Sequence, residues 1–385
     1  MRIRYQKAGL RMIPVARVYT ENEHHIDPKS IDRDAVRAIA RLREKGFEAY
    51  IVGGAVRDLL LGRVPKDFDI ATSASPRQIH RLFYNARIIG RRFKLVHLVY
   101  GDKIIEVSTF RGTSADSDDS NNVFGTIETD AVRRDFSVNS LYYDPMNGTI
   151  TDYNDSMADF RRRRLRSVLP LATTFKDDPV RMIRAVKYSV TTGFRMTVPL
   201  TFAIRRDRSC LSSVSPSRMT EEILKILGSG CSAPIIRQMQ RMGLLAYIMP
   251  CLCVYTRFEQ LYNSLDELDE KVRSSASHGG SGPEVDRSEF FLRLCGPFLV
   301  INPELETPEE LLRDIFRQIK VFIAPITPPN GELETAASLF MEENGLALPR
   351  YRRRRPAPKS AAKPAPGKNR RPRPHRPAKP EAPAD

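Results

Sequence analysis

The sequence predicts an α+β fold with a small mixed sheet, followed by an all-α part and a basic tail. Three observations predict it. Strand-like and helix-like segments alternate up to about residue 170, with glycine turns between them. From Thr197 onward the apolar residues follow helical spacing. The stretch 349–385 is rich in Pro, Lys and Arg, a composition that cannot form an apolar core and favours disorder.

Length and charge limit the class of protein. At 385 residues the chain can form two or more domains. Most of its net charge of +16 lies in the tail over 350–385, which would attract a polyanion such as RNA, or would simply solubilise the chain. The sequence contains no apolar run long enough for a membrane span, and its five cysteines lack disulfide or zinc spacing. We therefore expect a cytoplasmic protein with reduced thiols and no membrane association.

The first elements are an extended arm and a helix. Residues 1–29 are basic and show little periodicity, which predicts the arm. Apolar residues at helical spacing between Ser30 and Lys45 predict the helix, with Ser30 as its N-cap and Gly46 at its end.

A glycine pair follows the next predicted strand. The apolar residues 49–52 run into Gly53 and Gly54, which precede a helix-like segment that contains Arg57. Glycines let the backbone approach a ligand closely, and amides at a helix start attract phosphate. Arg57 adds a planar cation that could grip a phosphate oxygen. A glycine pair alone is a weak indication, because most such pairs are ordinary turns.

Two carboxylates make the indication specific. They occur in Lys66-Asp67-Phe68-Asp69, inside an apolar run. On a strand, Asp67 and Asp69 would point to the same face, where two like charges repel unless a cation lies between them. Two Mg²⁺ ions, for which Mn²⁺ could substitute, would bridge such carboxylates and a triphosphate. The combination predicts a nucleoside-triphosphate site.

The rest of the predicted head follows. A helix begins at Ser75 and Pro76, and two strands over 88–100 and 103–110 are joined at Gly101-Asp102. Glu106 lies in the second strand and either faces solvent or supports the acidic site.

Three segments complete the head. Residues 112–122 predict a surface loop, with a mobile loop over the site as the alternative. Residues 130–139 predict an amphipathic helix, in which an i,i+4 ion pair joins Asp130 and Arg134. Strands are expected over 149–153 and 161–168, and the four arginines 161–164 form an RNA-facing patch or merely a basic turn.

The helical part starts at Asp178 as N-cap and Pro179 as first helical residue. Asp178, Arg181 and Arg184 would share one helix face, where a carboxylate and a guanidinium can hydrogen-bond a base edge as a complementary strand does. Further helices are expected over 216–227, 235–245, 258–268, 290–300 and 311–323, with a flexible linker over 274–288.

Six segments together resemble the class II nucleotidyltransferases, the superfamily of bacterial poly(A) polymerases and tRNA CCA-adding enzymes. They are VGGAVRDLLLG, PKDFDIAT, IIGRRFKLVHLVYG, IIEVSTFRG, RRDFSVNSLYY and DDPVRMIRAVKY, in this order. The resemblance covers about residues 18–346 and implies a DNA-polymerase-β-like nucleotidyltransferase head. Asp177, where the family usually has Glu, and the four-arginine run depart from the family pattern.

The resemblance also implies roles for individual residues. Asp135 would join Asp67 and Asp69 as the third catalytic and metal-binding acid. With the residues identified above, the expected nucleotide-binding set is Gly53, Gly54, Arg57, Lys66, Arg133, Arg134, Asn139, Asp178, Arg181 and Arg184, with Glu106 in a supporting role. The implied domains are an arm over 1–29, a nucleotidyltransferase head over 30–170, a base-selecting neck over 171–230, an RNA-binding body over 231–348 and a disordered tail over 349–385.

The function implied by this resemblance is template-independent transfer of AMP from ATP to RNA 3′ ends, in mRNA polyadenylation and in RNA processing and decay. IIGRRFKLVHLVYG, PITPP and the basic tail look like the poly(A) polymerase version of these segments. CCA addition to tRNA is the alternative, because the head motifs are shared, and a non-catalytic RNA-binding protein is an alternative of another class. The expected partners are RNA 3′ ends and ATP, with the protein acting as a monomer.

Overall fold

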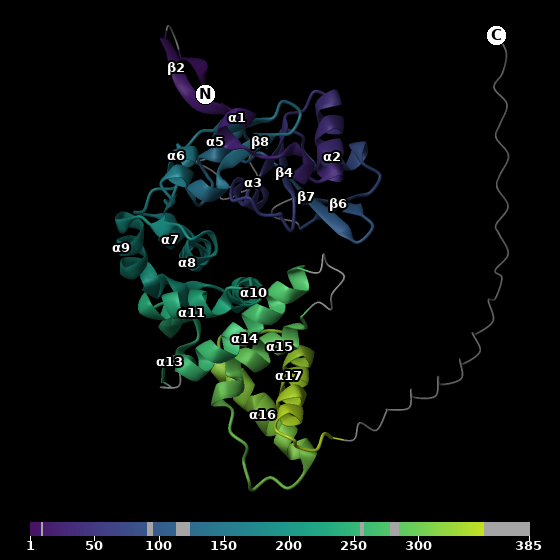
Figure 1. Ribbon diagram of the computed structural model, residues 1–385, viewed down its shortest axis with the longest axis vertical. Coiled ribbons are helices and arrows are strands. Elements are labelled where there is room, and N and C mark those ends of the chain that lie inside the picture. Colours follow the sequence, from purple (N-terminus) through teal and green to yellow (C-terminus); the bar gives the residue numbers. More distant parts are fainter. Residues whose placement is uncertain (9–10, 91–94, 113–123, 255–257, 278–284, 350–385) are drawn as a thin grey trace, which may run out of the picture.

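The computed structural model describes residues 1–8, 11–90, 95–112, 124–254, 258–277 and 285–349. An α+β head forms one end of this part of the chain and a stack of helices forms the other (Figure 1). The predicted loop over 112–122 lies almost entirely outside the described residues, as does the tail over 350–385.

The head is built on one mixed sheet of nine strands, which is larger than the small sheet expected. The strand order is β1-β2-β9-β8-β3-β4-β7-β6-β5, and β4 with β7 is the parallel pair among the described neighbours. The strands are β1 (Arg2–Ala8), β2 (Arg11–Thr20), β3 (Ala49–Val52), β4 (Asp69–Thr72), β5 (Ala86–Ile89), β6 (Leu95–Tyr100), β7 (Lys103–Thr109), β8 (Leu141–Asp144) and β9 (Thr149–Asp152).

Helices cover the two faces of this sheet unequally. One face packs against α2, α3 and α4 in a continuous apolar cluster that contains Ile39, Val56 and Ile79. On the other face, a smaller cluster joins α5 to β3, β4 and β8, with Phe110 and Tyr142 at its centre. The head helices are α1 (Glu21–His24), α2 (Arg33–Glu44), α3 (Gly54–Leu60), α4 (Pro76–Leu82), α5 (Ile127–Ala131) and α6 (Ser156–Arg161), with 3₁₀ turns at Pro28–Ser30 and Ser137–Asn139.

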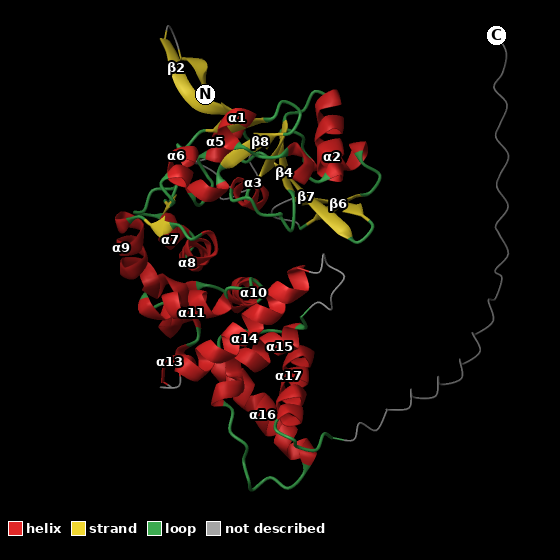
Figure 2. Ribbon diagram, viewed as in Figure 1, coloured by secondary structure: helices red, strands yellow, loops and turns green. Residues whose placement is uncertain are grey.

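Below the head the chain is helical, as the sequence predicted, apart from a two-stranded sheet of β10 (Arg164–Leu165) and β11 (Arg195–Met196) at the junction (Figure 2). One apolar cluster runs from Phe136 and Val138 of the head to Met341 near the end of the described chain. The helices are α7 (Thr174–Asp177), α8 (Val180–Thr192), α9 (Val198–Asp207), α10 (Pro216–Leu227), α11 (Ser232–Arg241), α12 (Leu245–Ile248), α13 (Pro250–Val254), α14 (Phe258–Ser277), α15 (Arg287–Cys295), α16 (Pro308–Ile323) and α17 (Asn330–Glu343). The domain boundaries proposed from the sequence stay predictions.

Two expectations for the head's first elements are wrong. The extended arm over 1–29 is largely the hairpin β1–β2, which extends the sheet by pairing β2 with β9. The N-cap of α2 is Asp32, whose Oδ1 accepts hydrogen bonds from the amides of Asp34 and Ala35 at 2.8 and 3.0 Å. Ser30 instead lies in the preceding 3₁₀ turn.

Later expectations are wrong where turns interrupt a regular pattern. The helix expected over 130–139 ends at Ala131, and the strand expected over 161–168 is reduced to Arg164–Leu165. Of the linker expected over 274–288, the first residues lie in α14 and the last in α15, while 278–284 lie outside the described residues; α17 was not predicted. Asp178 precedes α8 but does not cap it, because Pro179 occupies the cap position.

All five cysteines lie in the described residues as free thiols; Cys295 is buried and Cys253 is exposed. In the described part of the chain, no helix combines the length and the apolar character that crossing a bilayer would require.

The cap of α2 gives a test of local stability. Asp32→Ala should lower the free energy of unfolding by about 1 kcal/mol, because two amides of the first turn lose their acceptor. Ser30→Ala is the matched control and should change it by less than about 0.5 kcal/mol. Urea unfolding of both variants measures the difference, and equal losses would contradict the assignment of the cap.

Candidate active site

The floor of the candidate site is the parallel pair β4 and β7. Asp69 is the first residue of β4 and lies in register with Glu106 of β7. Ile70, Ile105 and Val107 are buried in the cluster beneath the sheet, so Asp69 and Glu106 project together from the other face. The sequence left open whether Glu106 faces solvent or the acidic site; strand pairing places it beside Asp69.

Asp69 lies in an environment that disfavours its charge. Burial raises the pKa of Asp69 to about 6; Glu106 and Asp67 add to the rise, and Arg134 opposes it. Asp67 precedes β4 rather than lying in it, so the expectation of two carboxylates on one strand is wrong. The negative charge of Asp67 nevertheless acts on Asp69 and adds to the rise in its pKa.

This donor set suits a hard cation. Asp67 and Asp69 offer carboxylate oxygens, the ligands that Mg²⁺ prefers, and a bound cation would offset the repulsion that adds to the effect of burial on the pKa of Asp69. Asp67 and Asp69 are the residues that would hold it. Within the described residues no three acidic, histidine or cysteine side chains form a cluster suited to a metal ion. The expected gathering of Asp135 with Asp67 and Asp69 around metal is therefore not seen.

Asp135 contacts the neck instead. Its Oδ2 lies 2.8 Å from Nη2 of Arg184 in α8, and its Oδ1 accepts a hydrogen bond from the amide of Phe136 at 2.8 Å. The side chain is only 9% exposed, and apart from the ion pair with Arg184 its buried Oδ2 has no hydrogen-bond partner among the described residues. The contact joins the head to the first turns of the neck helix.

The glycine pair keeps space beside the acids. Gly53 has a φ of +71°, and a Cβ built on it would lie 3.5 Å from Oδ2 of Asp69. A Cβ on Gly54 would lie 3.4 Å from Nη2 of Arg57. A Cβ at either position would make an ordinary van der Waals contact, and a side chain at Gly53 would also strain the backbone because of its positive φ.

Arg57 is held in a fixed position by three neighbours. Its Nε and Nη2 donate to the carboxylate of Asp58 at 2.9 Å each, and its Nη1 donates to Oδ1 of Asn139 at 3.2 Å. Its guanidinium also lies 5.3 Å from the ring centroid of Tyr188 in α8. Tyr188 accepts a hydrogen bond from Arg184 as well. Sequence reasoning missed Tyr188, although its place one turn after Arg184 could have indicated it.

The Arg133-Arg134 pair lies in a turn, not in a helix. Arg134 donates to Asp130 at 2.8 Å, which confirms the predicted pair, and both groups contact the hydroxyl of Tyr142. These contacts fix Arg134 near enough to Asp69 to oppose the rise in its pKa. Arg133 donates to the carbonyl of Gly112.

The three neck residues expected to read the base lie at the start of α8. Nε of Arg181 is 3.9 Å from Asp178, and its Nη1 donates to the carbonyl and the hydroxyl of Thr174 at 3.1 and 3.3 Å. Asp178 accepts a hydrogen bond from Arg218 of α10 at 2.9 Å. The Asp178–Arg181 pair is thus present, whereas Arg184 points to Asp135. No local sequence signal connects Arg218 to Asp178.

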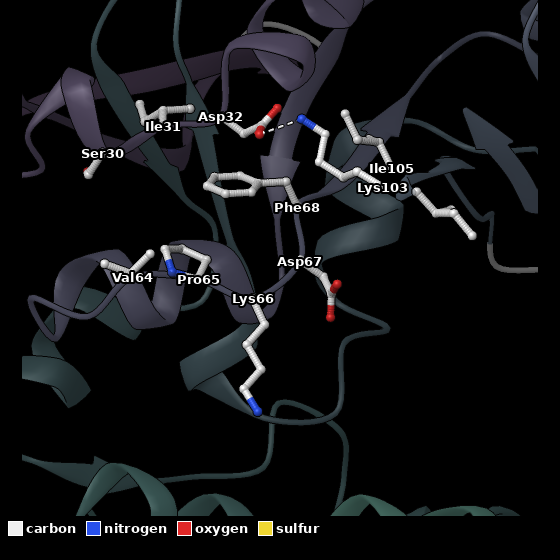
Figure 3. A pocket seen from close by; sticks show the side chains of 11 residues that line it. Ser30, Ile31, Asp32, Val64, Pro65, Lys66, Asp67, Phe68, Lys103 and Ile105 are labelled. Carbon is white, nitrogen blue, oxygen red and sulfur yellow. Dashed lines mark hydrogen bonds and ion pairs between the residues drawn. The ribbon is translucent and has the colours of Figure 1, made fainter. Parts of the chain in front are cut away.

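A cavity of about 230 Å³ adjoins the acids at the start of β7. Its lining includes Val64, Lys66, Asp67, Phe68 and Ile104. Figure 3 shows Lys66 and Asp67 extending away from Phe68, while Lys103 reaches across to Asp32. Lys66 thus shares the lining of this cavity with Asp67, and its expected role in nucleotide binding stays a prediction.

Comparison with known proteins identifies this class of site. Residues 49–166 match the family described as the poly A polymerase head domain, and residues 193–255 match a probable RNA- and SrmB-binding site of polymerase A. A structure of the CCA-adding enzyme of Bacillus stearothermophilus in complex with CTP is 26% identical, with a TM-score of 0.52, and the match covers 81% of this chain and 82% of that one. The head and the neck thus resemble the nucleotidyltransferases that include poly(A) polymerases and CCA-adding enzymes.

Curated relatives show the same resemblance. Poly(A) polymerase I of Haemophilus influenzae is 38% identical over 292 residues, which are 69% of this chain and 65% of the relative. The enzyme of the same name from Escherichia coli O157:H7 is 42% identical over 231 residues, 56% of this chain and 50% of the relative. The CCA-adding enzyme of Geobacillus stearothermophilus is 37% identical over 221 residues, 56% of this chain and 54% of the relative. The chain spans between half and two thirds of the length of these relatives.

The ion pair that supports Arg134 predicts a pH-dependent stability. Arg134 and the Tyr142 hydroxyl lower the pKa of Asp130 despite its burial. The stability that charged Asp130 contributes is therefore present above its unfolded pKa of about 3.9 and is lost as pH falls through the lower folded value.

Asp130→Asn should cost about 2 kcal/mol of unfolding free energy at pH 7, because a charged acceptor is replaced by a neutral one. The gap between variant and parent should shrink below about pH 4. Urea unfolding at pH 7, 4 and 3 measures it. A gap that stays constant across these values would show that the charge of Asp130 contributes nothing.

Proposed function

We propose that this protein is a polynucleotide adenylyltransferase, which adds AMP from ATP to RNA 3′ ends without a template. The observation that carries the proposal is the pair of carboxylates Asp69 and Glu106, set side by side in a head that matches poly(A) polymerases. The sequence similarity to poly(A) polymerase I of several bacteria supports adenylation over other transfers.

In this proposal each residue's role follows from its position in the site. Asp67 and Asp69 would hold two Mg²⁺ ions, which Mn²⁺ can replace, and Glu106 lies beside Asp69 in a supporting role. Such ions would supply a lower pKa for the RNA 3′-hydroxyl and positive charge for the departing pyrophosphate. Arg57 and Lys66 attract the triphosphate to this edge of the site.

Other residues orient the nucleotide. The turn at Gly53 and Gly54 leaves room for the phosphates to approach the backbone. Arg134 adds positive charge beside Asp69, and Arg133 precedes it in the same turn. Asn139 accepts a hydrogen bond from Arg57 and so lies next to the phosphate-binding guanidinium. Asp178 and Arg181 supply one acceptor and one donor group for the base edge.

We place Asp135 and Arg184 in a positioning role. Their ion pair fixes the start of α8 against the head, so the base-reading residues keep a set distance from the carboxylates. A direct contact of Asp135 with metal, implied by the family resemblance, remains a prediction.

The wider setting follows from the same proposal. RNA and ATP are the partners, and the protein acts as a monomer in the cytoplasm in mRNA polyadenylation, transcription-linked RNA processing and RNA decay. CCA addition to tRNA is the second candidate, favoured by the 37% identity to a CCA-adding enzyme.

Nucleotide choice separates these candidates. The purified protein would be incubated with Mg²⁺ and a 3′-hydroxyl RNA, and with ATP, CTP, GTP or UTP in turn. Long products with ATP alone are expected. One to three additions limited to CTP and ATP, and only on tRNA lacking CCA, would make it a CCA-adding enzyme. Asp69→Asn should slow extension by a factor on the order of 1000 or more.

The control for that variant is Asp266→Asn, an exposed change in α14 of the body that should leave the rate unaltered. Retained extension by Asp69→Asn would remove the enzyme assignment at this site. Absence of extension by the parent with every nucleotide and RNA would favour a non-catalytic RNA-binding protein.

Base selection gives a separate prediction. Asp178→Asn should reduce the preference for ATP over CTP and GTP on the order of 10- to 100-fold, because the base edge loses its charged acceptor. Asp177→Asn changes the exposed neighbour and should keep the preference. Single-nucleotide incorporation rates measure both. An unchanged ATP preference in Asp178→Asn would assign base reading to other residues.

A further inference from the structure

The sheet carries an uncovered surface next to the candidate site. Alternate residues of β6 and β7 are buried beneath the sheet, among them Val96, Leu98 and Val107. Their neighbours therefore point to the opposite face, where Asp69 and Glu106 lie. We call the surface formed there by β5, β6 and β7 the open face; its side chains are Arg87, Ile89, Leu95, His97, Val99 and Ile104.

The described helices leave this surface free. The apolar cluster under α5 includes Val52, Ala71 and Tyr142 and so covers β3, β4 and β8, not β5 to β7. Ile89 and Ile104 are 43% and 45% exposed, and Leu95 and Val99 are half-buried. These four apolar side chains form a small strip on the open face that a flat apolar ligand can contact.

The open face is continuous with the carboxylates. Consecutive register pairs join Arg87 to His97, His97 to Glu106, and Glu106 to Asp69 in one row across four strands. The row is tight, since Nε2 of His97 lies 3.4 Å from Oε1 of Glu106. A ligand lying on the open face therefore reaches Asp69 without crossing any covered part of the sheet.

The geometry of phosphoryl transfer indicates which ligand lies on the open face. The attacking oxygen and the leaving pyrophosphate lie roughly in line on opposite sides of the reacting phosphorus. Gly53, Arg57 and Asn139, which we assign to the nucleotide, lie on the β3 and β8 side of Asp69. The attacking hydroxyl must then approach from the β7 side, which is the side of the open face.

We propose that the open face binds the 3′-terminal nucleotides of the RNA substrate and delivers the 3′-hydroxyl to the carboxylates. This rests on the proposed function. Bases pack on the apolar strip of Ile89, Leu95, Val99 and Ile104, which suits any sequence because every base has a flat apolar side. Arg87 lies at the outer edge, where it meets backbone phosphate.

Strand β5 offers a matched pair of variants. Ile88 and Ile89 are adjacent, chemically identical and each 43% exposed, but they point to opposite faces of the sheet. Ile89→Asp should raise the KM for a short RNA about tenfold, because a carboxylate then opposes base packing and repels phosphate. Ile88→Asp should leave that KM unchanged, and both variants should keep the parent's KM for ATP. Ile104→Asp should reproduce the effect of Ile89→Asp.

Two results would overturn the proposal. Equal RNA KM values for the Ile88 and Ile89 variants would show that the open face does not take RNA. A rise in the KM for ATP in Ile89→Asp, with that for RNA unchanged, would assign the face to the nucleotide. A protein partner on this face would likewise leave the RNA KM unaltered.

A binding measurement separates this proposal from the proposed function. An RNA with 4-thiouridine near its 3′ end would be crosslinked to the full-length protein, and the attached peptides would be mapped. Crosslinks within 86–107 would support RNA binding at the open face even if the parent protein extends no RNA; that result would contradict only the proposed activity. Efficient extension with crosslinks confined to other peptides would contradict only the proposal for the open face.

Discussion

The parallel pairing of β4 with β7 is the constraint on which the site depends. In-register pairing brings Asp69 and Glu106 together, and burial makes their repulsion costly. Arg134 offsets that repulsion only in part, since the pKa of Asp69 is still raised. The fold surrounds the pair with groups whose positions are fixed by other contacts, such as Arg134, which is held by Asp130 and Tyr142. The negative charge that remains would favour a bound cation at this position.

The second constraint is the junction between the sheet and α8. Arg57 of the glycine-turn helix and Arg184 of the neck both contact Tyr188, and Arg184 also pairs with Asp135. These contacts link the segment assigned to phosphates with the helix assigned to the base. Because every member is at least partly buried, a shift of the neck would disrupt several contacts at once.

Much of this could be predicted from the sequence where local rules decide. The glycine turn, the helix capped by Ser75 and the helix over 216–227 lie where propensity and spacing placed them. Elements fixed by long-range pairing could not be predicted. Asp135 and Arg184 meet across the junction, and residues 17–20 at the end of β2 join the sheet by pairing with β9. Likewise, the open face follows from strand register, which alternation within one strand does not reveal.

The apolar cluster shared by head, neck and body limits how the chain can be divided. Phe136 and Val138 belong to the sheet-bearing part, yet they pack with Met182 and Val186 of α8. A fragment ended between them would expose this surface to water and tend to aggregate. Exchange of parts between relatives would therefore have to carry the head and α8 together. The head together with α8 is then the smallest part of the chain that recombination or protein engineering can transfer intact, and substrate specificity would be transferred with it.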